Sequence, residues 1–413
     1  MITISKPSIK QYESKTYLLT KISNEVDGFQ DVIWFSVSPI FGEYLCQEVA
    51  DPFVLLVLMQ AVLTQQDVMV DAPISNKLRY NLETALIHIF TYIYGLDKNH
   101  KIKVITKGEV ANNYGSSAYV VATGCSLGVD SMSTIKYHTS EACPIDYRLT
   151  HLTYFNIGAL GEHDLKEAEQ AYQKNLRMIR EYAKCLNLPV IEVESNSAIL
   201  FKDFDFDQSH TIRNMATVLS LQKLIRRYIY ASDFPVEHTN LSATHIGEYN
   251  QILLPLLSTD YTELIVADTD KTRTEKTRFI ADDDLVLQNL YVCWRDIFSN
   301  GNPGYKKLMD SISYRNCTRC DKCLRTALAL DILGVLKKYE KIFDLAEYYR
   351  VRKMYIFKVL DEQNTNIFYK ELADMMKYYR YDIPKNVLRK IQFKKYHLLW
   401  LWYAIKKCVD IVK

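Results

Sequence analysis

The chain has 413 residues, of which 48% are apolar and 24% are charged, and this composition excludes fibrous and disordered classes. The length predicts two to four domains. Lys and Arg number 51 against 49 Asp and Glu, so the net charge of +2 argues against generic nucleic-acid binding. Three of the nine cysteines lie between positions 317 and 323, which indicates metal binding in a reducing compartment. Because the N-terminus lacks an apolar signal core and no apolar run is long enough to span a bilayer, we expect a cytoplasmic protein.

Residues 1–112 are expected to form a small N-terminal α/β domain. Asp31–Ser38 is β-branched and aromatic, which is typical of a strand. Pro52–Leu63 and Ser75–Tyr94 have the apolar spacing of helices. Since the segment carries no catalytic motif, we interpret it as a packing domain or a substrate cap.

Residues 113–330 alternate short apolar strands with helical stretches, which predicts an α/β fold with a parallel sheet flanked by helices. The expected strands are Ala118–Thr123, Leu152–Ile157, Leu188–Val193, Arg227–Ala231 and Thr262–Ala267, and the expected helices are Asp164–Leu186 and Arg213–Tyr230.

Residues 331–413 are expected to be all-helical. The candidate helices are Val335–Leu345, Tyr349–Leu360, Ile367–Tyr378 and Val387–Val412. Within residues 392–412 the run HLLWLWYAI is flanked by lysines. This pattern fits a homodimer contact through the C-terminal helices, packing inside the chain, or peripheral contact with a membrane, of which membrane contact is the least favoured.

The most informative stretch is YVVATGCSLGVDSMSTI, residues 119–135, in which a buried strand leads through a small-residue loop into a helix. Backbone amides of such a loop bind polyanions at the helix N-terminus. Gly124 and Gly128 allow close approach of a phosphate, and Ser126 and Ser131 add hydroxyl donors. Asp130 fits a role in orienting the loop or holding hydrated Mg²⁺. The alternative is an ordinary strand–turn–helix with capping serines.

Cys317, Cys320 and Cys323 form a Cys-x₂-Cys-x₂-Cys motif that can supply three ligands of a tetrahedral Zn²⁺. Cys293 is the best candidate for the fourth ligand, and His210 and Cys408 are weaker ones. An iron–sulfur cluster and a group of free thiols are the two alternatives.

Further candidates lie at strand ends and helix starts. Asn156 and Gly158 follow an expected strand, so they are placed where ligands bind in open α/β sheets. His210, or Arg213 near it, can steady a phosphate, or His210 is a plain surface histidine. Arg273 and Lys276 lie in the basic stretch TDKTRTEKT and are candidate phosphate ligands, with a solvated loop as the alternative.

The stretch after the first buried strand resembles the PP-loop of ATP pyrophosphatases, whose pattern is Ser-Gly-Gly-x-Asp-Ser. Ser126, Gly128, Asp130 and Ser131 match it, and Leu127 replaces the first glycine of the pair. The resemblance implies an adenine nucleotide alpha hydrolase-like, HUP-type fold that binds ATP and Mg²⁺. The nucleotide-binding residues that it implies are Gly124, Ser126, Leu127, Gly128, Val129, Asp130, Ser131, Asn156 and Gly158, and the catalytic ones are Asp130, His210, Arg273 and Lys276.

The order of the two motifs is similar to that of 7-cyano-7-deazaguanine synthase, a PP-loop enzyme with structural zinc. Cys293-Trp294 matches its Cys-aromatic pair, and Cys317, Cys320 and Cys323 match its later cysteines. The resemblance covers about half of the chain. It implies adenylation of an oxygen of a small-molecule substrate, a carboxylate or an amide, with release of pyrophosphate, and then displacement of AMP by a nitrogen nucleophile. RNA base modification or thiolation, a non-catalytic nucleotide-binding scaffold and a zinc module for partner contact are the alternatives.

Overall fold

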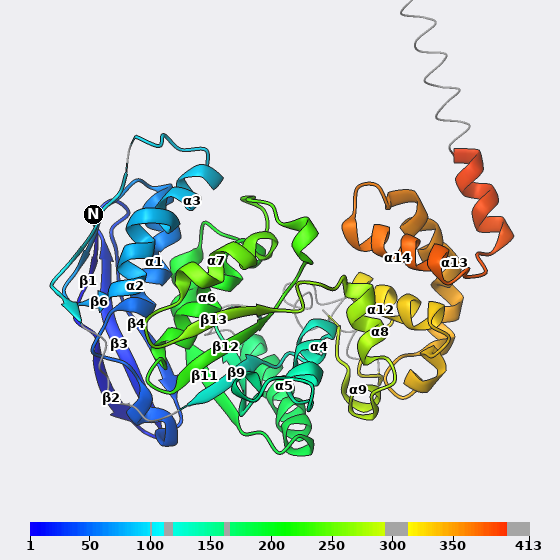
Figure 1. Ribbon diagram of the computed structural model, residues 1–413, viewed down its shortest axis with the longest axis horizontal. Helices are drawn as coiled ribbons and strands as arrows, with labels where there is room; N and C mark the ends of the chain where they lie inside the picture. Colours follow the sequence, from blue (N-terminus) through cyan, green and yellow to red (C-terminus); the bar gives the residue numbers. More distant parts are fainter. Residues whose placement is uncertain (100, 111–118, 161–165, 294–312, 395–413) are drawn as a thin grey trace, which may run out of the picture. The chain divides into compact units, whose positions relative to one another are not determined.

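The computed structural model describes residues 1–99, 101–110, 119–160, 166–293 and 313–394. The chain divides into two compact units, Met1–Lys271 and Thr272–Lys413 (Figure 1). This grouping differs from the three segments expected from sequence. Strands from both sides of position 112 pair in one sheet, so the N-terminal segment and the predicted nucleotide-binding segment share a core.

The first unit is an α/β structure. Its strands are β1 (Ile2–Ile4), β2 (Ser8–Tyr12), β3 (Lys15–Asn24), β4 (Phe29–Val37), β5 (Val68–Val70), β6 (Ile74–Ser75), β7 (Val104–Thr106), β8 (Glu109–Val110), β9 (Val120–Gly124), β10 (His151–Asn156), β11 (Val190–Ser195), β12 (Ile225–Ala231) and β13 (Glu263–Ala267). Its helices are α1 (Asp51–Leu63), α2 (Asn76–Asn81), α3 (Ile87–Ile93), α4 (Val129–His138), α5 (Lys166–Cys185), α6 (Phe206–Ser220) and α7 (Asn250–Leu257).

One 11-stranded sheet organises this unit, in the order β13-β12-β9-β10-β11-β4-β3-β1-β5-β7, with β2 paired to β3. The five strands β9 to β13 are all parallel to their neighbours within that set. β4 joins them antiparallel, through a register that pairs Val37 with Val193 on β11. The central part of the sheet is therefore parallel, as predicted, and the N-terminal strands extend it.

Helices cover both faces of the central strands (Figure 1). α4 and α5, which follow β9 and β10, lie on one face, while α1, α6 and α7 lie on the other. α1 is apolar on all sides, and 11 of its 13 residues are buried. A helix of this kind belongs in a core, and α1 packs directly against α6.

The second unit is helical in the part that the structure describes. Its helices are α8 (Arg273–Ile280), α9 (Asp284–Asn289), α12 (Asp321–Ile332), α13 (Leu345–Glu362) and α14 (Ile367–Tyr378), and residues 385–394 are also helical. The rest of the expected helix Val387–Val412, with the run HLLWLWYAI and Cys408, lies outside the described residues. None of the helices in the described part combines the length and apolar character that crossing a bilayer requires.

Two expected helices differ in the structure. The helix predicted over Arg213–Tyr230 begins earlier, at Phe206, and ends at Ser220, and the sequence IRRYIYA that follows is strand β12. The capping box of Asp205 and Gln208 starts this helix, while β-branched and aromatic residues favour the strand. The helix predicted over Val335–Leu345 is only a 3₁₀ turn, Leu336–Tyr339.

Candidate functional site

The small-residue loop joins the carboxyl end of β9 to the start of α4. The amide of Cys125 donates to the carbonyl of Thr153 on β10 (2.9 Å), which fixes the beginning of the loop. Gly128 is the N-cap of α4 and has no side chain that accepts hydrogen bonds from the amides of the first turn. These amides and the positive end of the helix dipole face the loop, which is an arrangement suited to an anion.

Two serine hydroxyls hold the loop in shape. The Oγ atoms of Ser126 and Ser131 lie 3.1 Å apart. The Oγ of Ser126 accepts from the amide of Gly128 (3.3 Å), and the Oγ of Ser131 donates to the Gly128 carbonyl (3.1 Å). The predicted hydroxyl donors are therefore neighbours at the start of α4, with Val129 and the half-buried Asp130 in the first turn.

Leu127 has a left-handed backbone, with φ of 59°, and its side chain is buried, at 1% exposure. A leucine in this conformation is disfavoured by about 1 kcal/mol, whereas glycine adopts it freely. The residue that departs from the Ser-Gly-Gly pattern thus has the backbone conformation that glycine favours. The burial of its side chain in the core offsets this backbone strain.

The loop lies at the point where the order of the parallel strands reverses. β9 has β10 and then β11 on one side, and β12 and then β13 on the other. Helices leaving β9 and β11 therefore lie on opposite faces of the sheet. In open α/β sheets ligands bind outside the carboxyl ends of the strands at such a reversal.

Asn156 and Gly158 lie at the neighbouring carboxyl end, that of β10. The Nδ2 atom of Asn156 is buried without a hydrogen-bond partner in the described part of the chain, and the side chain is 3% exposed. Tyr154, two residues earlier, stacks on Tyr172 of α5, so Asn156 faces the same side of the sheet. That side is the one on which α4 begins, which is consistent with the prediction that Asn156 contacts a nucleotide.

His210 on α6 forms a polar cluster at the carboxyl end of β12. Its Nδ1 lies 2.9 Å from the hydroxyl of Tyr230, and its Nε2 lies 3.8 Å from an Asp233 oxygen. The ring of His245 is 5.5 Å away. Burial lowers the pKa of His210, so the imidazole is neutral near pH 7. His210 is therefore a buried group near the carboxyl end of β12, and the alternative of a plain surface histidine is wrong.

Tyr230 lies near enough to Asp130, in the first turn of α4, for the charge of that carboxylate to act on its hydroxyl. Burial raises the pKa of Tyr230, and the negative charges of Asp233 and Asp130 raise it further. Sequence reasoning did not select Tyr230, Asp233 or His245. Tyr230 and Asp233 share one signal, which is their position at the end of a buried strand, where functional groups gather in this type of sheet, and His245 carries none.

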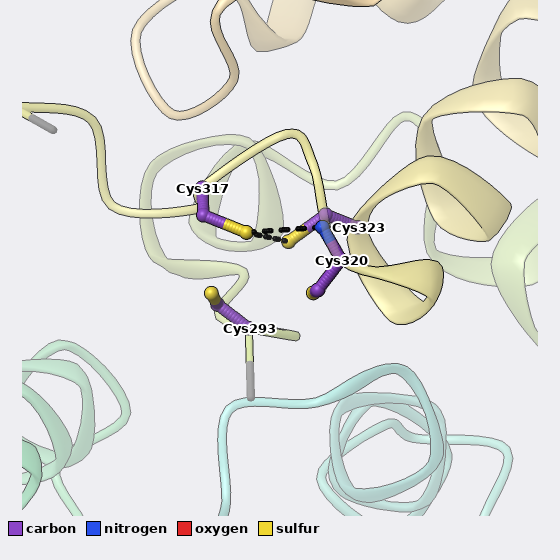
Figure 2. A group of neighbouring side chains, drawn as sticks. All are labelled: Cys293, Cys317, Cys320 and Cys323. Carbon is purple, nitrogen blue, oxygen red and sulfur yellow. Dashed lines mark hydrogen bonds between the residues drawn. The ribbon is translucent and has the colours of Figure 1, made fainter. Parts of the chain in front are cut away.

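In the second unit, Cys293, Cys317, Cys320 and Cys323 come together, with their sulfur atoms all within 4.8 Å of one another (Figure 2). Cys317 and Cys320 belong to the turn that leads into α12, Cys320 is the N-cap of that helix, and Cys323 lies in its first turn. Three of the four side chains are buried. Cys293 thus completes the group, as expected, whereas His210, a weaker candidate, belongs to the other unit.

The cluster fits one tetrahedral ion. Zn–S bonds of about 2.3 Å place tetrahedral sulfurs about 3.8 Å apart. The sulfurs of Cys317 and Cys323 are 3.7 Å apart. In an iron–sulfur cluster the four thiolates are divided among two or four irons, so the sulfurs on different irons lie farther apart, and this geometry favours a single ion. Hydrogen bonds among the thiols lower the pKa of Cys317 and raise the pKa of Cys293, so the metal-free group holds a thiolate and a thiol side by side. A metal would require all four to be thiolates.

Asn316 holds the two parts of the cysteine cluster together, and sequence reasoning missed it. Its Oδ1 accepts from the amide of Val292 (2.8 Å), and its Nδ2 donates to the carbonyl of Leu290 (3.0 Å). The residue is fully buried. It therefore fixes the segment that carries Cys293 beside the turn that carries Cys317, and its position directly before Cys317 was the only signal.

Arg273 and Lys276 lie on α8, in the second unit. Glu371 on α14 accepts from the amide of Arg273 (3.0 Å), and the guanidinium of Arg273 lies over the ring of Phe368 at 4.9 Å. The side chain of Lys276 is 1% exposed. The alternative of a solvated loop is therefore wrong for these residues, while their role as phosphate ligands stays a prediction.

Comparison with protein-family models, with curated proteins and with solved structures finds no match to this chain. The geometry of the two units is thus the basis for an inference about function.

Proposed function

We propose that the chain is an ATP-dependent enzyme of the PP-loop type, with an adenine nucleotide alpha hydrolase-like, HUP-type fold in its first unit. The observation that carries the proposal is the position of Ser126–Ser131. The loop leaves the central strand at the reversal of strand order and opens α4 with a glycine N-cap. Its matches to the PP-loop pattern are short, and their position at this reversal, where open α/β sheets bind ligands, supports the proposal.

In this proposal the pyrophosphate of ATP binds to the amides and hydroxyls of Ser126–Ser131, and Asp130 orients the loop or holds a hydrated Mg²⁺. Asn156 and Gly158 border the nucleoside. The neutral imidazole of His210 donates a hydrogen bond to the α-phosphate as negative charge develops. The reaction is adenylation of a carboxylate or amide oxygen of a small molecule with release of pyrophosphate, followed by displacement of AMP by a nitrogen nucleophile.

The four cysteines are proposed to bind one structural Zn²⁺. All four positions of the tetrahedron are supplied by the protein, which is typical of a structural rather than a catalytic zinc site. The ion would link the Cys293 segment to α12. None of the eight cysteines in the described residues forms a disulfide, and a cytoplasmic location belongs to the proposal.

The test is native mass spectrometry of the wild type, Asp130→Ala and the surface control Asp146→Ala, each with and without Mg·ATP. We expect an ATP adduct in the wild type and in Asp146→Ala and its loss in Asp130→Ala. Pyrophosphate release is then measured with a panel of small carboxylates and amides plus ammonia. Absence of an ATP adduct in the wild type would refute the proposal. An adduct without turnover on any member of the panel would favour the scaffold instead.

A further inference from the structure

Arg213 on α6 is a buried cation without an acidic partner in the described part of the chain. Its guanidinium is 5% exposed and lies over the rings of Phe201 and Phe206, at 4.4 and 5.5 Å from their centroids. Its Nε donates to the hydroxyl of Ser209 (2.9 Å), and one terminal nitrogen donates to the carbonyl of Ile157 (3.4 Å). A guanidinium has five N–H donors, so three of the five lack an acceptor among the described residues.

A buried charge of this kind is unfavourable for the protein alone. Burial lowers the pKa of Arg213 to about 10, and no neighbouring negative charge in the described residues offsets this effect. Arginine cations in protein interiors are normally paired with carboxylates or bind anionic ligands. An arginine that meets no carboxylate among the described residues can therefore bind an anionic ligand.

The position of Arg213 indicates where such a partner would bind. The carbonyl of Ile157 is the first after the end of β10, which is the strand next to β9 and its loop. Arg213 also lies close enough to His210 to lower the pKa of that imidazole. The guanidinium thus belongs to the carboxyl edge of the parallel strands, on the face covered by α6, whereas α4 begins on the opposite face.

We propose that Arg213 forms a subsite for an anionic oxygen group, a carboxylate or a phosphate, at the carboxyl end of β10. As a planar donor it would bind two oxygens of that group in parallel hydrogen bonds. Within the proposed function two sources carry such a group, the carboxylate of the acceptor and the α-phosphate of ATP. The identity of the source depends on the proposed function, whereas the existence of the subsite does not.

The variant Arg213→Met tests the subsite, because methionine keeps an apolar side chain against Phe201 and Phe206 and removes the charge. The control is Arg226→Met, at an exposed arginine at the opposite end of β12 that donates to the carbonyls of Asp260 and Tyr261. Thermal unfolding of the full chain is measured at constant ionic strength against acetate, succinate, inorganic phosphate and AMP. ATP affinity is measured in parallel, with Asp130→Ala as the reference for loss of the loop.

We expect at least one anion to stabilise the wild type and Arg226→Met, and its apparent affinity to fall about 10- to 100-fold in Arg213→Met, as when a charge-assisted pair is lost. Without ligand, Arg213→Met should unfold at the same or a higher temperature than the wild type. A fall in AMP and ATP affinity would identify the α-phosphate as the source. Unchanged ATP affinity with loss of the acetate or succinate effect would identify the acceptor carboxylate.

Equal responses of the wild type and Arg213→Met to every anion, including no response in either, would overturn the subsite. So would strong destabilisation of Arg213→Met without ligand, because the arginine would then be structural. If ATP fails to bind while an Arg213-dependent anion response persists, the proposed function fails and the subsite stands. If ATP binds in an Asp130-dependent manner and no anion response depends on Arg213, the proposed function stands and the subsite fails.

Discussion

Asp51, the first residue of α1, makes the stability of the first unit depend on pH. The side chain is fully buried. The amide of Ser75 donates to its Oδ1 (2.8 Å), and the Nε2 of Gln222 donates to its Oδ2 (3.1 Å). Both donors are neutral, so burial dominates and raises the pKa of Asp51 from 3.8 to about 6. The folded state therefore binds this proton more tightly than the unfolded state.

The direction and size of the effect follow from the two pKa values. The stabilisation is fully present below the unfolded pKa of 3.8 and is lost as pH rises through the folded value of about 6. A difference of about two units corresponds to about 3 kcal/mol in the free energy of unfolding. Asp51→Asn has no charge and should lack this slope. The substitution places an amide group opposite the Nε2 donor of Gln222, and this mismatch lowers the free energy of unfolding by about 1 kcal/mol at every pH.

The two stability curves should consequently cross. At pH 4, where the unfolded-state carboxyl is already partly ionised, we expect Asp51→Asn to be less stable than the wild type by about 0.5 kcal/mol, and at pH 7 more stable by about 2 kcal/mol. Urea denaturation from pH 4 to 7 measures this, with hydrogen exchange in peptides from α1 reporting the transition of the first unit. Asp203→Asn, at an exposed position, is the matched control and should follow the wild type. Parallel curves for the wild type and Asp51→Asn would refute the reasoning.

Three further predictions concern the cysteine cluster and the loop. Cys317→Ser should reduce zinc from about one ion per chain to near zero by elemental analysis, whereas Cys185→Ser, outside the cluster, should keep it; equal zinc content in both would contradict a four-cysteine site. Asn316→Ala leaves two buried backbone groups unsatisfied, so we expect a loss of about 2–4 kcal/mol in chemical denaturation and 10- to 100-fold weaker zinc binding in chelator competition; unchanged zinc affinity would show that Asn316 does not position the ligands. Leu127→Gly removes about 2 kcal/mol of burial but relieves about 1 kcal/mol of backbone strain, so the net loss should be only about 1 kcal/mol by thermal unfolding; a loss above about 3 kcal/mol would mean that Leu127 is not strained.

The sequence was most informative where one local pattern determines the structure. The apolar spacing of Ile367–Tyr378 predicted α14 with its observed bounds, and Thr262–Ala267 predicted β13 to within one residue. The spacing of Cys317, Cys320 and Cys323 predicted a group that can hold a metal, because it brings three thiols together within a single turn. In these cases the interactions that decide the structure lie within a few residues of one another.

Features that depend on distant partners were not predictable in this way. β3 (Lys15–Asn24) was missed, although it is the longest strand in the described part of the chain, because its alternating pattern acquires meaning only when β4 and β1 pair with it. The strand that begins at Ile225 was partly read as helix because its environment is formed by distant elements, β9 and β13 beside it and α4 against it. Asn316 and Asp233 were missed for the same reason, since an isolated polar residue gives no sign that its partners lie elsewhere in the chain.

The pairing of β4 with β11 has a consequence for dissecting this protein. Without β4, β11 would be an open edge, and the carbonyls and amides of Val193–Ser195 would offer a template for strands of other molecules. Loss of the N-terminal residues would also remove α1 and uncover the apolar face of α6. A fragment cut at position 113, although it would contain the whole loop Ser126–Ser131, should therefore aggregate. β4 and α1 therefore protect β11 and α6 from contacts with other molecules, and studies of the segment that carries Ser126–Ser131 are best made on the intact first unit.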